Sequence, residues 1–226
     1  MTSPTPNLPN ESHLLEDYNF VVLGLPGVGK STFVTQFTTT HHPAQTSPPP
    51  STLPHQQIQL SVDNQPCQIS LSEAGPSSSS VALRKEYISA SQAAILMYSI
   101  TSKESFEKIR EIWGEVREVK EEMGMWEPFQ MGLVGNKMDL EGERVVGVHE
   151  GMGVAETLGC AFWEAEAETG RNTKELVEEL VRKVRTYRDN ERIRYEQMKE
   201  EAEKAKKEKV KNDRRKKMMP WKRLFS

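Results

Sequence analysis

The sequence predicts an α/β protein with a mostly parallel sheet that is covered by helices on both faces. Short apolar runs typical of buried strands alternate with longer segments whose apolar residues have helical spacing. Several of the strands are followed by glycine-containing or polar loops. Because ligands bind at the carboxyl ends of strands in such sheets, we expect the site residues in the loops after Leu23, Leu71, Val134 and Trp163.

Composition limits the classes of protein that are possible. The 226 residues suffice for one domain with extensions, and a hydrophobic content of 36% indicates that part of the chain lies outside the core. The two cysteines, Cys67 and Cys160, exclude a disulfide scaffold and a zinc module and suit a reducing compartment. No run of 18 apolar residues is long enough to span a bilayer, and residues 1–10 lack the apolar segment of a signal peptide.

Charge divides the chain into unlike parts. The net charge is −3, yet residues 204–226 contain eleven Lys and Arg against two acidic residues, a formal charge of +9 that leaves −12 on residues 1–203. We expect a disordered leader over 1–17, a globular domain over 18–188, and a charged helical extension with a basic tail over 189–226.

The first half of the chain predicts a strand, a helix, a hairpin and a second helix. The apolar run YNFVVL is stopped by Gly24, and Phe33, Val34 and Phe37 form one side of a short helix. Breaker residues over 39–57 prevent that helix from continuing, and alternating apolar residues follow on both sides of a DNQP break. The expected ranges are a strand over 18–23, a helix over 30–38, a hairpin through 58–62 and 69–71, and a helix over 81–91.

The second half continues the alternation of strands and helices. Thr101 with Glu104, and Asn172 with Glu175, have the spacing of capping boxes that open helices. The first box precedes a long helix with Phe106, Ile109, Trp113 and Val116 inside, and the second precedes a helix with a row of Leu and Val. The other expected elements are strands over 93–100, 131–134 and 161–163 and a helix over 149–158.

The loop after the first strand, GLPGVGKS, matches the phosphate-binding pattern G-x-x-x-x-G-K-[ST]. Glycines let the backbone wrap a phosphate, and successive N–H groups at a helix N-terminus attract the anion. We expect the Lys30 ammonium to contact the outer phosphates and the Ser31 hydroxyl to bind Mg²⁺. A glycine-rich turn without a ligand is the alternative, but the flanking strand and helix favour a site. The candidate phosphate-binding residues are Gly24, Gly27, Val28, Gly29, Lys30, Ser31 and Thr32.

The loop after residues 131–134 contains the residues Asn136-Lys137-Met138-Asp139. The Asp139 carboxylate can accept both edge N–H groups of guanine, a pattern that adenine lacks. Asn136 can tie this loop to the phosphate loop, and the Lys137 stem can lie along the purine face. On its own the motif is also compatible with a polar turn; beside a phosphate loop it indicates a guanine site.

Because it contains both motifs, the chain resembles a Ras-family small GTPase over residues 18–187. The resemblance rests on GLPGVGKS, LSEAG where the family has DTAG, SQAAILMYSITSKESFEKI, LVGNKMDL, and FWEAEAETG where the family has a segment like FIETSAKTG. It implies the Ras-like P-loop NTPase fold with six strands, GTP and GDP binding with Mg²⁺, switch loops, and effector and regulatory proteins. It also implies that the backbone N–H of Ala167 meets the guanine carbonyl oxygen.

The resemblance is weaker in the switch segment, which in the family contacts the outermost phosphate and its metal. Ser72 stands at the family's metal-side Asp and can hydrogen-bond a metal-bound water without adding charge. Glu73 would replace that Asp only if the loop shifted by one residue. Pro76 stands where the family has a Gln that orients the attacking water, and proline has no side-chain donor or acceptor. We therefore expect slow intrinsic hydrolysis.

Three further positions depart from the family. A Thr that closes over the phosphate and Mg²⁺ is best matched by Thr52, with Ser51 and Thr46 as alternatives, within a proline-rich loop where Thr52 can equally be solvated. Glu168 stands where a Lys would lie over the base, which predicts weaker nucleotide binding. His42 takes the place of an aromatic residue that packs on the base.

The C-terminal segment adds aromatic residues to its positive charge and ends in Arg-Leu-Phe-Ser, without the cysteine of a lipidation box. Charge and aromatic residues without lipid predict a weak, reversible contact with anionic membranes. A nuclear import signal at 214–217 and a solubilising tail are the alternatives. We expect a cytoplasmic protein, peripheral at the inner membrane face or nuclear in the alternatives, and no nucleic-acid partner.

Two functions remain open at this point. The first is a guanine-nucleotide signalling switch with slow GTP hydrolysis. The second is a pseudo-GTPase scaffold that binds nucleotide without hydrolysing it, which Ser72 and Pro76 favour.

Overall fold

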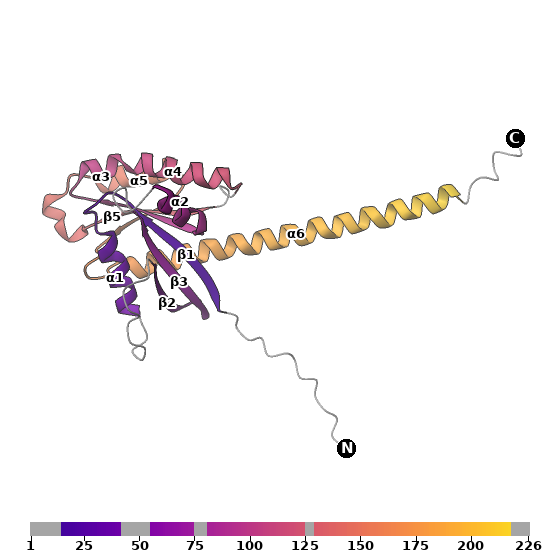
Figure 1. The fold of residues 1–226 in the computed structure, drawn as a ribbon, viewed down its shortest axis with the longest axis horizontal. Coiled ribbons are helices and arrows are strands. Elements are labelled where there is room, and N and C mark those ends of the chain that lie inside the picture. Colours follow the sequence, from indigo (N-terminus) through magenta and orange to yellow (C-terminus); the bar gives the residue numbers. More distant parts are fainter. Residues whose placement is uncertain (1–14, 42–54, 75–80, 125–128, 218–226) are drawn as a thin grey trace, which may run out of the picture. The chain divides into compact units, whose positions relative to one another are not determined.

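The computed structural model describes residues 15–41, 55–74, 81–124 and 129–217. Its centre is a six-stranded sheet in the order β2-β3-β1-β4-β5-β6, in which β2 and β3 are antiparallel and all other neighbours are parallel (Figure 1). This arrangement confirms the predicted Ras-like α/β fold. The strands are β1 (Glu16–Leu23), β2 (His55–Val62), β3 (Gln65–Ala74), β4 (Ala93–Ser99), β5 (Gln130–Asn136) and β6 (Ala161–Ala165).

Helices cover both faces of this sheet, as expected. One buried cluster joins α1 and the first turns of α6 to the sheet, and a second joins α2, α3, α4 and α5 to its other face (Figure 1). The helices are α1 (Lys30–His41), α2 (Val81–Ala90), α3 (Lys103–Glu107), α4 (Ile109–Glu122), the 3₁₀ helix η1 (Met138–Glu143), α5 (Val148–Leu158) and α6 (Thr173–Lys217).

The alternation of side chains along β3 decides what its end presents to the site. Cys67, Ile69 and Leu71 are fully buried in the cluster on the α1 face, whereas Ala74 belongs to the cluster on the opposite face. Because successive side chains of a strand point to opposite faces, Glu73 continues the row of Cys67, Ile69 and Leu71. The end of β3 thus places Glu73, and not its neighbour Ser72, on the side of α1.

Several element boundaries differ from the sequence prediction. β1 begins at Glu16, so the last residues of the expected leader are part of the sheet. α1 continues to His41, one turn beyond the predicted end. Thr38 and Thr39 donate from their hydroxyls to backbone carbonyls one turn earlier, which satisfies these polar side chains inside the helix. The hairpin turns on Asp63 and Asn64 alone, both with positive φ.

Both predicted capping boxes were placed incorrectly. The first helix cap is Ser102, whose hydroxyl accepts from Ser105 N at 3.2 Å. The helix after it is divided into α3 and α4 at Lys108, where ψ opens to −13°. Asn172 has a left-handed backbone with φ +62° rather than the extended backbone of a cap, and its side chain donates to the Glu164 carbonyl.

A lysine is buried beside the second core cluster, where the pattern of apolar residues did not predict it. The Lys120 side chain is 1% exposed, and its Nζ donates to the carbonyls of Ser89 and Ser91 at the C-terminal end of α2. It also lies 4.5 Å from the centre of the Phe129 ring. Burial lowers the pKa of Lys120 to about 8. This residue joins α4 to the end of α2.

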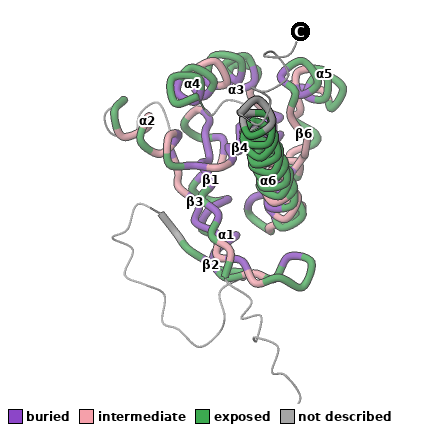
Figure 2. The backbone as a smooth tube through the Cα atoms, turned by 90° about the vertical axis from the view of Figure 1, so that its right-hand side faces the viewer, coloured by how far each residue is buried: buried purple, intermediate pink, exposed green. Residues whose placement is uncertain are grey.

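The C-terminal unit, residues 185–226, is described as far as Lys217 and is helical over that range. Its side chains are mostly exposed, including Ile193, Tyr195 and Met198, as the green colour of this part of α6 shows in Figure 2. This agrees with the predicted solvated helical extension. Within the described residues, none of the helices has the length and apolar character to cross a bilayer.

Candidate functional site

The predicted phosphate loop lies between the end of β1 and the start of α1. Gly27 and Gly29 have φ values of +79° and +101°, a conformation that residues with a side chain rarely adopt. A Cβ at Gly29 would also collide with the side-chain nitrogen of Asn136. Glycine is therefore required at Gly29, both for the turn and for the approach of the loop to β5.

Lys30, the first residue of α1, points back into this loop. Its ammonium donates to the Leu25 carbonyl at 3.0 Å and lies 4.0 Å from a carboxylate oxygen of Glu73, while only 5% of the side chain is exposed. Burial lowers the pKa of Lys30, and the nearby Glu73 charge partly opposes this shift. A buried cation held by one carbonyl and a distant carboxylate is suited to binding an additional anion.

Ser31 and Thr32 follow Lys30 in the first turn of α1. Together with Thr35 and Gln36 they line an open depression at the surface. The Ser31 hydroxyl donates to Glu73 Oε1 at 2.9 Å. The first turn of α1 thus presents backbone N–H groups and hydroxyls at the carboxyl end of the sheet, where the sequence placed the ligand.

Asn136 connects the phosphate loop with the two loops predicted to hold the base. This residue is 1% exposed at the end of β5. Its side-chain nitrogen donates to the Val28 carbonyl at 2.8 Å, and its oxygen accepts from Ala167 N at 3.0 Å. The predicted tie between the motifs is therefore present. The Ala167 N–H, expected to meet a guanine carbonyl, donates to Asn136 in this structure.

Lys137 and Asp139 begin the segment that follows β5. Lys137 has a left-handed backbone with φ +68°, and its side chain is half-buried. Non-glycine residues in this conformation are uncommon and concentrate at functional sites. Asp139 lies in the first turn of η1 with its carboxylate exposed. Its position at the carboxyl end of β5 fits the predicted role toward the edge of a base.

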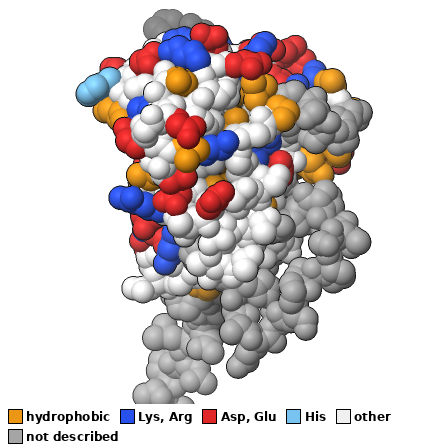
Figure 3. Space-filling model, turned by 90° about the vertical axis from the view of Figure 1, so that its left-hand side faces the viewer, with side chains coloured by type: hydrophobic (Ala, Val, Ile, Leu, Met, Phe, Trp, Pro, Cys, Tyr) orange, Lys and Arg blue, Asp and Glu red, His pale blue; other side chains and the backbone are white. Residues whose placement is uncertain are grey.

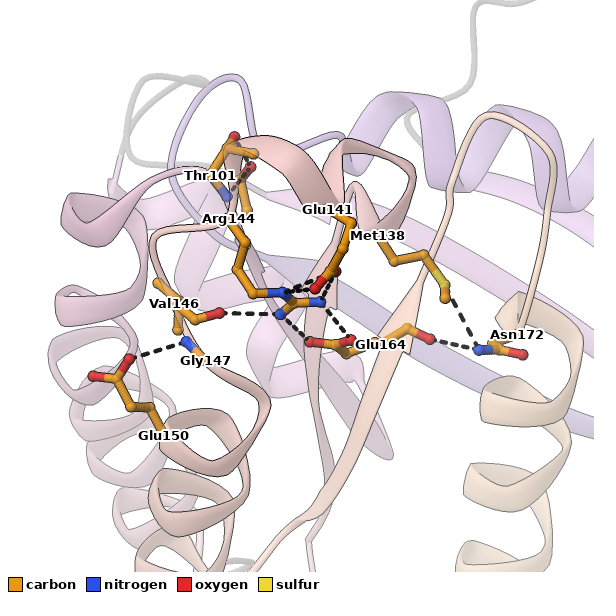
Figure 4. Close-up of polar contacts among 10 residues, drawn as sticks. Thr101, Met138, Glu141, Arg144, Val146, Gly147, Glu150, Glu164 and Asn172 are labelled. Atoms are coloured by element: carbon orange, nitrogen blue, oxygen red, sulfur yellow. Dashed lines mark hydrogen bonds and ion pairs between the residues drawn. The ribbon is translucent and has the colours of Figure 1, made fainter.

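A charged network holds this segment against β6 (Figure 4). Arg144 donates to Glu141 and Glu164 and to the Val146 carbonyl, with distances to Glu164 of 2.6 and 3.0 Å. Its hydrogen bonds to Glu164 and then to Glu141 raise the pKa of Arg144, so the charge is permanent. Asn172 donates to the Glu164 carbonyl at 2.7 Å. Sequence motifs did not reveal this network, because its members are separated along the chain.

Glu73, and not Ser72, is the residue of the LSEAG segment that contacts the phosphate loop. The expected contributor was Ser72, but Glu73 is the residue that accepts from the Ser31 hydroxyl, because strand alternation directs it to the α1 side. A serine hydroxyl and a carboxylate oxygen 2.9 Å apart are hard oxygen donors of the kind that Mg²⁺ prefers. Ser31 and Glu73 therefore fit a magnesium ion, with further ligands coming from phosphate and water.

Other candidates for the switch loops fall outside the described residues. These are Thr52 with its alternatives Ser51 and Thr46, and also His42 and Pro76. Glu168 is described and exposed. The described residues of the candidate site are thus those of the phosphate loop, the loops after β5 and β6, and Glu73.

Comparison with known families agrees with this geometry. The model of the family described as the Ras family matches residues 19–186. The match includes β1 from Asn19 onward, the phosphate loop, Asn136, Asp139 and Ala167, and it spans well over half of the chain.

Proposed function

The chain belongs to the Ras family of small GTPases, and from that premise we propose that it is a guanine-nucleotide signalling switch that binds GTP and GDP with Mg²⁺. The observation that carries this proposal is the buried Asn136, which bonds to Val28 of the phosphate loop and to Ala167 of the base loop. These contacts hold the phosphate loop and the loop that carries Asp139 at one edge of the sheet. A glycine-rich turn without a ligand would not require this arrangement.

Each candidate residue has a chemical role in this proposal. Lys30 and the N–H groups from Gly27 to Ser31 hold the phosphates. Asp139 selects guanine by accepting from the two N–H groups on the edge of the base, and the Lys137 stem lies along the base. The Ala167 N–H serves the guanine carbonyl after releasing the Asn136 side chain, to which it donates in this structure. Ser31, joined by Thr52 from the first switch loop, holds the metal.

Titration with fluorescent GDP and fluorescent ATP tests base selection. The wild type should prefer GDP by at least about a hundredfold, since a site that hydrogen-bonds a specific edge strongly rejects a base without it. Asp139→Ala should lose most of this preference. The matched control is Glu143→Ala, which removes an exposed carboxylate from the same 3₁₀ helix. Equal affinity of the wild type for both nucleotides would exclude the guanine assignment.

Hydrolysis is the weaker part of the proposed activity. Pro76 stands where a water-orienting Gln is expected, so we propose slow intrinsic turnover. A pseudo-GTPase scaffold that retains nucleotide is the second candidate, and the same residue favours it. Single-turnover hydrolysis separates them: Pro76→Gln should accelerate GTP cleavage of a slow enzyme, whereas a scaffold stays inactive in both forms.

Partners are proposed from charge and family. Effector and regulatory proteins follow from a switch function, and the mixture of acidic and basic side chains on the face in Figure 3 gives no single-sign surface there for nucleic acid. We propose a cytoplasmic location, with the basic C-terminal segment making weak contact with anionic membrane and nuclear import as the alternative. Full-length protein should co-sediment with phosphatidylserine vesicles at low salt and dissociate at high salt. Equal sedimentation with neutral vesicles would exclude this contact.

A further inference from the structure

Glu73 contacts two residues of the proposed nucleotide site but has no role in the function proposed above. Its carboxylate accepts a hydrogen bond from the Ser31 hydroxyl at 2.9 Å and lies 4.0 Å from the Lys30 ammonium. Both partners are residues assigned to the nucleotide: Lys30 to its outer phosphates and Ser31 to its metal. A negative side chain therefore already occupies the groups that an incoming phosphate and cation need.

The position of Glu73 is built into the strand. It follows Cys67, Ile69 and Leu71 on the face of the sheet that α1 covers, and these three side chains are fully buried. β3 pairs with β1 without interruption as far as Leu23 and Ala74. The residues before and after Glu73 are therefore both fixed in the sheet. The side chain itself is 35% exposed, so an ion from solvent can reach its carboxylate.

Electrostatics gives this carboxylate two opposite effects. Without a divalent cation, the carboxylate and a nucleotide phosphate are like charges that compete for one ammonium and one hydroxyl. With a divalent cation, the same carboxylate becomes a hard oxygen ligand beside Ser31, and the repulsion is neutralised. The sign of its contribution to nucleotide affinity therefore depends on the cation.

We propose that Glu73 makes nucleotide affinity depend on the divalent cation: its carboxylate opposes nucleotide binding when the cation is absent and supports binding when the cation is present. This inference rests on the proposed function, and it concerns one residue of this chain. It predicts that release of nucleotide is controlled by removal of the cation to a greater extent than Ser31 alone would allow.

Fluorescent GDP binding to the full-length protein tests the proposal in excess Mg²⁺ and in EDTA. Glu73→Gln keeps a side chain that can hydrogen-bond Ser31 but removes the charge. We expect it to bind GDP at least about fivefold more weakly in Mg²⁺ and at least about twofold more tightly in EDTA, since a charged hydrogen-bond partner contributes more than a neutral one. The ratio of the two affinities should therefore fall at least about tenfold.

Glu118→Gln is the matched control, because it removes the same charge from an exposed position on α4; its ratio should equal that of the wild type. Glu73→Ala repeats the test without any polar side chain, and circular dichroism confirms that each variant is folded. An unchanged ratio in Glu73→Gln, or an equal loss of affinity in both buffers, would overturn the proposal while leaving the guanine assignment intact. Absence of GDP binding by the wild type in both buffers would overturn both.

Discussion

The two ends of the proposed nucleotide site are built differently. The base end is fixed by contacts already made within the protein: the neutral Asn136 amide bonds to Val28 and Ala167, and the Arg144–Glu164 ion pair holds the adjoining segment. The phosphate end depends on charge: a buried Lys30 has one carbonyl and a carboxylate 4.0 Å away. Asn136 and Asp139 of the family's base motif and the phosphate loop itself are present, whereas the end of β3 and the segment that follows it depart from the family at Ser72 and Pro76.

This difference teaches that selecting the ligand and responding to it place different demands on the fold. A base pocket works best when it is already formed, so its contacts also stabilise the protein. A phosphate site must keep a desolvated charge ready for its ligand, which costs stability until the ligand arrives. Substitutions at the two ends should therefore affect nucleotide affinity and the free energy of unfolding in different proportions.

The largest effect on affinity is expected for Lys30→Met. Removing the buried ammonium should weaken GDP binding by about a hundredfold or more, because charge-assisted bonds to phosphate are among the strongest polar contacts. The free energy of unfolding of the nucleotide-free protein should stay equal or rise near neutral pH, since the buried charge is lost. Isothermal titration and urea denaturation measure the two quantities. A destabilised Lys30→Met protein would contradict the contrast between the two ends.

Lys30→Met should also change how the free energy of unfolding depends on pH. The pKa of Lys30 is lowered in the folded protein, so the unfolded chain binds more protons between that value and the ordinary lysine pKa. The free energy of unfolding should therefore rise with pH across this alkaline window in the wild type and rise less in Lys30→Met. Lys120, with its pKa lowered to about 8, contributes the same kind of slope to both proteins. The difference between the two slopes isolates Lys30.

Asn136→Ala should reduce both quantities. It leaves the Val28 carbonyl and the Ala167 N–H without their buried partner, which should lower the free energy of unfolding by about 2–4 kcal/mol. GDP affinity should fall by roughly tenfold or more as the loops separate. Thermal denaturation without nucleotide gives the first effect. Asn172→Ala is a comparison that removes an amide from the adjoining loop without touching Val28. If Asn136→Ala kept wild-type stability, the base end would not be preformed.

The Arg144–Glu164 pair tests the base end from a greater distance. Arg144→Ala leaves a mostly buried Glu164 carboxylate without its partner, so the free energy of unfolding should fall by about 2 kcal/mol. GDP affinity should change by only a few-fold, because neither residue is assigned to the ligand. Arg144→Lys keeps the charge but not the two parallel bonds, and should lie between Arg144→Ala and the wild type. A larger loss of GDP affinity than of stability would place Arg144 in direct contact with the ligand.

The order of strands and helices could be predicted from the sequence because each element carries its own pattern, as YNFVVL does before Gly24 and the alternation at Ile58 and Leu60 does in the hairpin. Local motifs likewise gave Lys30, Ser31, Asn136 and Asp139 as candidate site residues, and this assignment stays a prediction. The cap at Ser102 could not be distinguished from Thr101, nor the Asn172 contact with Glu164 from a cap, since serine, threonine and asparagine suit several positions near a helix start.

Pairing between distant residues is what the sequence could not supply. Lysine is usually exposed at the surface, and only the fold brings the carbonyls of Ser89 and Ser91 to the Lys120 ammonium. Arg144 and Glu164 have no spacing that signals a pair. For LSEAG, alignment on the glycine favoured Ser72, whereas the face of β3 that packs on α1 selects Glu73. Strand alternation was available in the sequence; the face on which α1 packs was not.

The smallest effect is expected for Ser72→Asp, which restores the family's residue at the aligned position. Alternation along β3 places Ser72 on the face opposite α1, so a new carboxylate there should not reach Ser31, whose hydroxyl bonds to Glu73. The affinity for GDP in Mg²⁺ should change by less than about twofold, within the range of surface substitutions. Ser70→Asp is an unsuitable control, since Ser70 is buried, whereas Gln68→Asp adds a carboxylate earlier on the same face as Ser72. Tighter GDP binding in Ser72→Asp, and not in Gln68→Asp, would show that residue 72 reaches the metal side of the site. The role proposed for Glu73 would then be wrong.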